Sequence, residues 1–134
     1  MNVIICLDDN NGMLFNNRRQ SRDIALLCDV FDDLQGEKLY ITPFSEKLMA
    51  EYSQGVIVCE DASSLADGQW FFCESLDLTA FSEKIERLIV YRWNRAYPSD
   101  MKCELDFSLF SLVGESELVG NSHPVITKQT FVRG

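Results

Sequence analysis

The stretch VIICLDDNNGMLFNNRRQSRD, residues 3–23, decides how the rest of the chain is organised. Residues 3–7 are a continuous apolar run with β-branched side chains, which is typical of a strand buried on both faces. Residues 11–23 are polar, rich in Asn and Arg, and too many for a tight turn. Long loops held between rigid elements often carry binding or catalytic residues. We therefore expect residues 11–23 to form a loop that carries part of the protein's function.

A helix is predicted directly after this loop, because apolar side chains recur at helical spacing between Ile24 and Leu34. Ser21 is predicted to cap its first turn, and Asp23 lies near the start, where the helix dipole favours a carboxylate. Gly36 is placed to end the helix.

The remaining chain alternates strands with short helices and then continues as strands alone. We expect the strand at 56–59 to be buried. The predicted strands cover residues 39–42, 56–59, 70–73, 87–93, 102–113 and 125–132, and the predicted helical segments cover residues 43–52 and 78–84. This order indicates one α/β domain, residues 1–134, whose sheet has an antiparallel C-terminal edge.

Composition restricts the classes of function. A chain of 134 residues is the size of a single domain, and its formal net charge of −9 argues against a general nucleic-acid partner, which needs a basic face. The sequence shows no signal peptide and no apolar stretch long enough to span a membrane, so we expect a cytoplasmic protein without a membrane partner. The five cysteines form no CxxC pair and are expected to be reduced thiols.

Several motifs with known chemistry are missing. The sequence contains no GxGxxG and no GxxxxGK[ST] phosphate loop. One histidine and scattered cysteines give no metal-ligand spacing, so no metal site is expected.

Two groups of residues remain as candidate sites. In the first, Arg18, Arg19 and Arg22 accompany Asp23 at the start of the helix. They are either surface arginines beside a helix-stabilising acid, or a partly buried carboxylate in a cleft, with arginines that orient an anionic or planar ligand. In the second group, residues 91–95 read YRWNR, which suits either a planar ligand or the packing of an edge strand.

The order of elements resembles a dihydrofolate reductase in shortened form. The residues that carry this resemblance are Ile4–Leu7 with Asn11–Met13, Asp23, Leu39–Thr42, Glu86–Tyr91 with the loop to Asp100, and Gly120–His123 with Phe131–Arg133. The resemblance implies a central, mostly parallel sheet with helices on both faces and an antiparallel C-terminal hairpin. It also implies that Asp23 is the acid that binds a pterin ring, with Ile5, Leu27 and Tyr91 among the ligand contacts.

The sequence departs from the family's pattern at the cofactor-binding positions. Pro43–Glu46 replaces the family's Gly-Arg-x-Thr, and Cys73-Glu74 replaces its Gly-Gly pair. Side chains at these positions would obstruct a phosphate, and the Glu74 carboxylate would repel it. Met101 stands where the family has threonine, and no arginine for a folate tail is evident near Gln54. We therefore expect no cofactor.

Three functions remain open at this point, and so does the question of whether the protein is an enzyme. The first is a divergent dihydrofolate reductase-like domain that binds a small polar heterocycle near Asp23 without ordinary NADPH-dependent reduction. The second is an active pteridine or folate oxidoreductase with altered NADPH contacts, in which Asp23 and Glu74 form a catalytic pair of carboxyls. The third is a protein-interaction module that forms a homodimer through its C-terminal strands.

Overall fold

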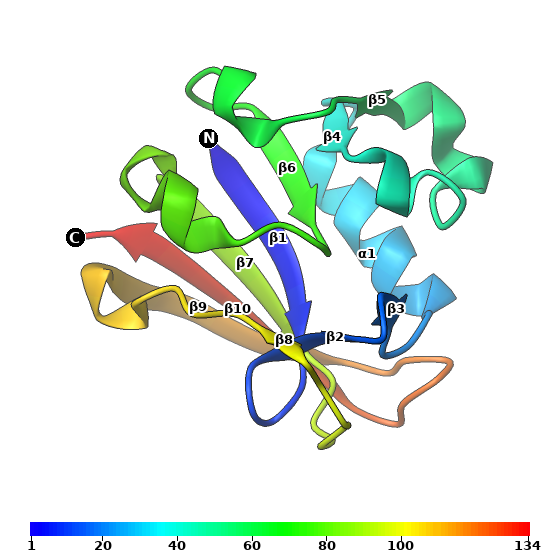
Figure 1. Cartoon of the computed structure of the whole chain (residues 1–134). Coiled ribbons are helices and arrows are strands. Elements are labelled where there is room, and N and C mark those ends of the chain that lie inside the picture. Colours follow the sequence, from blue (N-terminus) through cyan, green and yellow to red (C-terminus); the bar gives the residue numbers. More distant parts are fainter.

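A computed structural model describes all 134 residues, and its centre is a seven-stranded sheet in the order β5-β4-β6-β1-β7-β10-β9 (Figure 1). The pairs β1/β6, β1/β7, β4/β5 and β4/β6 are parallel, and β10 pairs antiparallel with both β7 and β9. The strands of this sheet are β1 (Asn2–Leu7), β4 (Leu39–Ile41), β5 (Val56–Val58), β6 (Trp70–Cys73), β7 (Arg87–Arg92), β9 (Phe110–Leu118) and β10 (Ile126–Arg133). The mostly parallel sheet and its antiparallel C-terminal hairpin confirm the predicted fold class.

Each face of the sheet has its own apolar core. The single α-helix, α1 (Ile24–Leu34), packs on one face with Ile4, Phe72 and Tyr91. The 3-10 helices η1 (Pro43–Ser45) and η2 (Ala50–Gly55) follow β4 in the chain. The opposite core contains Ile5 and Val90, and the short helices η3 (Ala62–Ser64) and η4 (Leu78–Lys84) contribute to it. Alternation along β1 therefore sends Ile4 and Ile5 into different cores, as period-two side chains require.

Residues 11–23 are more regular than the predicted loop. They contain β2 (Gly12–Phe15) and β3 (Arg18–Arg19), which join β8 (Met101–Lys102) in a small antiparallel sheet. Asn16 and Asn17 connect β2 to β3 with φ angles of 50° and 59°. Positive φ at both central residues is typical of the tight hairpin turn that matches strand twist, and Asn tolerates it better than most residues. The prediction of a loop was therefore wrong for residues 12–15 and 18–19.

The helix begins at Ile24, later than a cap at Ser21 predicts, and is capped by a different residue. The Asp23 side chain accepts a hydrogen bond from the Leu26 amide, so Asp23 rather than Ser21 is the N-cap. At the other end Gln35 has a left-handed conformation with φ 48°, and Gly36 follows it at φ 90°.

Three further predictions differ from the structure. Residues 43–52 form only 3-10 turns, with a kink at Tyr52, whose ring stacks on Phe31 with centroids 4.2 Å apart. The strand at residues 56–58 is an edge strand, and Ile57 is 39% exposed rather than buried. Residues 102–113 are not one strand, because Lys102 belongs to β8 and the short helix η5 (Phe107–Leu109) precedes β9. No helix is long and apolar enough to cross a membrane.

Candidate functional site

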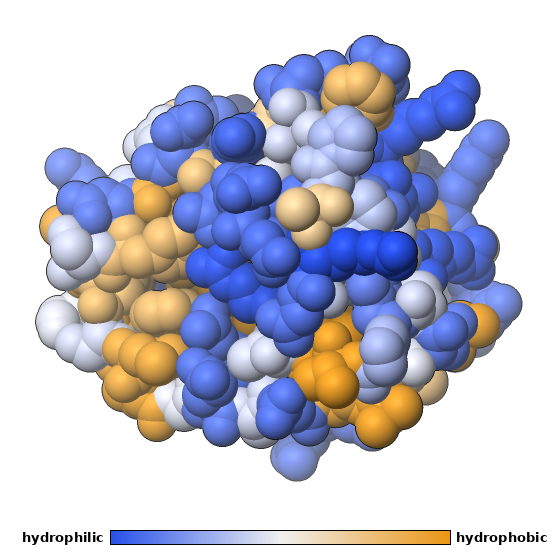
Figure 2. All heavy atoms as spheres, turned by 90° about the horizontal axis from the view of Figure 1, so that it is seen from below, coloured by the Kyte–Doolittle hydropathy of each residue, from blue (hydrophilic) through white to orange (hydrophobic).

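A cavity lies at the carboxyl end of β1 and β6, between α1 and the small sheet. Open α/β sheets commonly bind their ligands at this edge. The interior of the cavity has a volume of about 30 Å³, and the space including its open mouth is about 430 Å³. Its apolar wall consists of Cys6, Met13, Leu26, Leu27, Leu48, Phe72, Cys73 and Trp93. Viewed from this end of the sheet, the surrounding surface is largely hydrophilic, with separate apolar patches (Figure 2).

Polar side chains complete the lining, and most come from the segment between β2 and α1. They are Arg19, Gln20, Ser21, Arg22, Asp23 and Glu74. Asp23 and Glu74 therefore line the same cavity. A mixed wall of apolar side chains with a few converging polar groups is the usual composition of a small-molecule site.

Asp23 is 2% exposed, and its carboxylate already has three hydrogen-bond donors. Oδ1 accepts from the Leu26 amide at 3.0 Å, while Oδ2 accepts from the Ser122 amide at 2.8 Å and the Ser122 hydroxyl at 2.7 Å. Burial opposes ionisation of this carboxyl, but the bonds from Ser122 and Leu26 outweigh it and hold the pKa of Asp23 below its ordinary value. The Asn121 amide contributes as well, so these donors use most of the roughly four acceptor positions that a carboxylate offers.

The partner of Asp23 belongs to a chain of hydrogen bonds that sequence reasoning missed. Ser122 Oγ lies 2.7 Å from His123 Nδ1, and His123 Nε2 lies 2.6 Å from the Tyr97 hydroxyl. The His123 ring also stacks on Trp93, with centroids 4.8 Å apart. Burial, aided by the charge of Arg95, lowers the pKa of His123, so its neutral form is favoured. The loop between β9 and β10 thereby fixes both Asp23 and the Trp93 wall of the cavity.

A glycine allows this loop to approach Asp23 closely. A Cβ atom at Gly120 would lie 2.5 Å from Asp23 Oδ2 and 2.6 Å from the His123 carbonyl oxygen. Both distances are shorter than van der Waals contact, so any side chain at this position would displace the loop. The sequence shows a glycine at position 120 but does not indicate that this glycine faces Asp23.

Glu74 is held by hydrogen-bond donors from β3 and η1. Its carboxylate accepts from Arg19 Nε at 2.7 Å, from Arg19 Nη2 at 2.9 Å and from the Ser45 hydroxyl at 2.6 Å. The hydrogen bond to Glu74 is the main cause that raises the pKa of Arg19. This two-point contact is the strong geometry of an arginine–carboxylate pair.

Asp8 is a further buried acid that the sequence did not single out. It is fully buried, and its side chain accepts from the amides of Asn10, Gly12 and Tyr97 at 2.7–2.9 Å. The Gln20 Nε2 group also donates to it at 3.1 Å. Burial raises the pKa of Asp8, but these donors outweigh it and lower the pKa overall. Asp8 thus ties the small sheet to the end of β1.

Gln20 carries the one buried side-chain polar atom of the chain that has no hydrogen-bond partner, its carbonyl oxygen Oε1. The orientation of the amide follows from its neighbour, since only the NH₂ group can donate to the Asp8 carboxylate. Buried polar atoms are nearly always paired, and this exception belongs to a residue of the cavity wall.

The predicted contact residues are only partly gathered here. Leu27, Arg19, Arg22, Asp23 and Glu74 line the cavity. Ile5 lies outside the lining, in the core on the other face of the sheet. Tyr91 is also outside it, and its hydroxyl donates to Asp29 at 2.6 Å. Arg18 is exposed on β3, outside the lining.

No group of three or more His, Cys, Asp or Glu side chains is arranged to hold a metal ion.

Comparison with known proteins identifies the fold of the chain. No family model matches the chain, and no curated protein matches it. Among solved structures, it is similar to the dihydrofolate reductase from Enterococcus faecalis complexed with NADP(H) and RAB-propyl, with a TM-score of 0.67 over 98% of this chain and 95% of that one. The two sequences are 11% identical, and at this level structural similarity shows a shared fold but not a shared function. The chain therefore has a dihydrofolate reductase-like fold.

Proposed function

We propose that this chain is a divergent dihydrofolate reductase-like domain that binds a small polar heterocycle in the cavity beside Asp23, without ordinary NADPH-dependent reduction. The observation that carries the proposal is the unpaired Gln20 Oε1 in the cavity wall. A ligand N–H that reaches this atom removes the cost of leaving a buried acceptor without a partner.

The shape and charges of the cavity support a flat ligand. Leu27, Phe72 and Trp93 give the cavity an apolar and aromatic surface against which a ring can pack. Arg22 lies at the cavity and makes no hydrogen bond or ion pair with the chain, so it is free to meet a polar substituent. The ligand class is thus a planar heterocycle whose edge donates hydrogen bonds.

The two acids are better suited to binding than to proton transfer. Hydrogen bonds keep Asp23 ionised at neutral pH, so it has no proton to donate there. The Glu74 carboxylate is occupied by Arg19 and Ser45. Both groups are therefore fixed parts of the wall, and this favours a binding domain over an acid–base enzyme.

The residues after β6 do not fit a dinucleotide phosphate. Glu74 places a carboxylate there, and the chain has no glycine between Gly68 and Gly114 to let a phosphate approach the backbone. A reductase with altered NADPH contacts is the alternative. An assay that follows NADPH absorbance with dihydrofolate present separates the two, and we expect no turnover. Steady oxidation that depends on both compounds would establish the reductase instead.

A second candidate function, homodimer formation, is favoured by the exposed strand β9. This strand lies at the edge of the sheet, and Leu112 and Val113 are 50% and 59% exposed. Unpaired edge strands with apolar side chains can pair with another chain. Sedimentation of the wild type and of Leu112→Lys tests this, with a dimer that becomes a monomer in the variant as the supporting result. A wild-type monomer at high concentration would reject it.

Calorimetric titration with dihydrofolate, other pterins and nucleotides tests the main proposal. We expect at least one pterin-like ring to bind, and Gln20→Met to weaken it about three- to tenfold, as expected for one lost hydrogen bond of ~1 kcal/mol. Arg18→Met is the matched control, because Arg18 lies outside the lining and should leave the affinity unchanged. Absence of heat with every compound, or equal affinities for wild type and Gln20→Met, would refute the proposal.

A further inference from the structure

The side chain of Glu74 is bound by its own protein as an anionic ligand would be. Two nitrogen atoms of Arg19 and the hydroxyl of Ser45 converge on its two oxygens, at distances from 2.6 to 2.9 Å. These donors come from different segments, β3 and η1, while Glu74 directly follows β6. A planar guanidinium fork with an added hydroxyl is the set of donors that proteins use for carboxylates and phosphates.

The donors are positioned independently of Glu74. Arg19 Nη2 also lies 3.4 Å from the Phe44 carbonyl oxygen, and the guanidinium stacks over the Phe44 ring at 5.2 Å from its centroid. Ser45 is fully buried in η1. The guanidinium would therefore keep its place if the carboxylate were removed, so the subsite is preformed.

The Glu74 carboxylate is also well shielded from solvent. Its side chain is 10% exposed and that of Arg19 is 27% exposed. A phosphate in the same place would have to displace a carboxylate that is tethered to the site. Such a tethered group acts at an effective concentration that is roughly millimolar or higher, which free phosphate at lower concentrations cannot match.

We propose that Arg19 and Ser45 form an anion-binding subsite in the cavity wall, which Glu74 occupies as an internal ligand. Glu74 is then a specificity-determining residue, because it excludes ligands that carry a phosphate or carboxylate at this end and admits those that are neutral there. Only the statement about neutral ligands rests on the function proposed above. The subsite itself is defined by its own donors.

Removal of the internal ligand tests the subsite directly. Glu74→Ala takes away the carboxylate, and Glu74→Gln keeps its shape but removes the negative charge. Isothermal calorimetry with inorganic phosphate, at ionic strength held constant with sodium chloride, compares both with the wild type. We expect Glu74→Ala to bind phosphate at least tenfold more tightly than the wild type does, and Glu74→Gln to show a smaller increase.

The double variant Glu74→Ala with Arg19→Met is the matched control, and it should lose the gained affinity. If Glu74→Ala does not fold, the isosteric Glu74→Gln carries the test alone. Phosphate affinities equal to that of the wild type in every folded variant would overturn the proposal, as would a gain that survives the loss of Arg19. A failure of heterocycle binding in the wild type would leave this result untouched, so the two proposals fail separately.

Discussion

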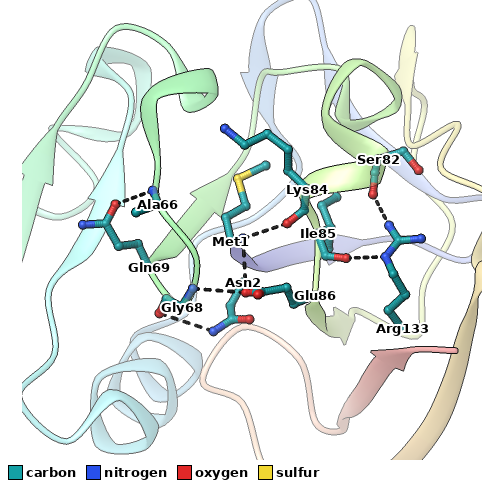
Figure 3. A network of polar contacts seen from close by, with 10 residues as sticks. All are labelled: Met1, Asn2, Ala66, Gly68, Gln69, Ser82, Lys84, Ile85, Glu86 and Arg133. Carbon is teal, nitrogen blue, oxygen red and sulfur yellow. Dashed lines mark hydrogen bonds and ion pairs between the residues drawn. The ribbon is translucent and has the colours of Figure 1, made fainter.

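The two ends of the parallel strands use polar groups for opposite purposes. At the amino end, backbone and side-chain groups close on one another: Glu86 accepts from the Gly68 amide, and Arg133 donates to the Ile85 carbonyl at 2.9 Å (Figure 3). At the carboxyl end, Asp8, Asp23 and Glu74 also accept hydrogen bonds, but Oε1 of Gln20, a residue of the cavity wall, has no partner. Polar groups close the first end, while the second keeps an unpaired acceptor, to which the proposed function assigns a ligand.

This difference follows from where the acids lie. Glu86 is 49% exposed and Asp23 is 2% exposed. Hydrogen bonds to an exposed carboxylate replace bonds to water and add little to stability. A buried carboxylate has lost its hydration, so the hydrogen bonds from the protein that replace it contribute more to stability. The carboxyl end is therefore the more sensitive to substitution.

Asp23→Ala should have the largest effect, because it removes the helix cap and leaves the Ser122 groups without their acceptor. We expect a loss of about 2–4 kcal/mol in the free energy of unfolding, measured with urea. Glu86→Ala, the matched change at the amino end, should cost no more than about 1 kcal/mol. Equal losses for the two variants would abolish the proposed contrast between the ends.

Gly120→Ala should rank next, since the added Cβ would lie 2.5 Å from Asp23 Oδ2. The loop must shift, at a cost of about 1–3 kcal/mol. Gly114→Ala in β9 is the control, because its nearest neighbour would be Thr130 Cβ at 3.8 Å, an ordinary contact. Thermal unfolding of both variants checks this. A Gly120→Ala protein as stable as the wild type would show that the loop is not packed closely against Asp23.

Arg19→Met should cost about 1–2 kcal/mol, because it leaves the shielded Glu74 carboxylate without its charged partner, while the partial exposure of Arg19 moderates the loss. Arg22→Met should change little, since Arg22 is exposed and makes no ion pair. Urea unfolding of the two variants measures the difference. Indistinguishable midpoints would mean that the Arg19–Glu74 pair contributes nothing measurable to stability.

The smallest effect concerns pH. Because burial lowers the pKa of His123 in the folded state, only the unfolded chain takes up a proton just below about pH 6.5. Stability should thus be constant above that pH and decline as the pH falls toward the lowered, folded pKa. His123 is the only histidine of the chain, so His123→Gln should abolish the slope in this window. If the free energy of unfolding of the variant still declines in this pH window, groups other than His123 cause the decline.

Periodic features of the fold could be read from the sequence. The apolar run at 3–7 and the helical spacing at 24–34 identified β1 and α1, since each pattern reflects local geometry. The small sheet was missed although Asn16-Asn17 is a hairpin signal, because Arg-rich flanking residues do not resemble a strand. The strand at 56–58 was assigned to the interior, but a parallel strand with the same apolar residues can also lie at an edge.

The candidate site was accessible to sequence reasoning only in part. Asp23 and Arg19 were identified because they lie in the stretch that joins β1 to α1. The contact of Asp23 with Ser122 joins residues 99 positions apart, and the Arg19–Glu74 pair spans 55 positions. No local pattern encodes such contacts, and neither does the unpaired state of Gln20. These donors determine whether each carboxyl is ionised and free to react. The sequence therefore identified Asp23 and Glu74 as candidates but could not show that both carboxylates already accept hydrogen bonds.

The two tryptophans provide the most direct test of the claim that ligand binding belongs to the carboxyl end. Trp93 lines the cavity there, and Trp70 begins β6 at the amino end. Nitrogen–proton NMR spectra recorded during titration with dihydrofolate report on both indole N–H groups at once. We predict that the Trp93 resonance shifts in a saturable manner while that of Trp70 stays fixed. A shift of Trp70 alone, or of neither resonance with any pterin, would contradict the account.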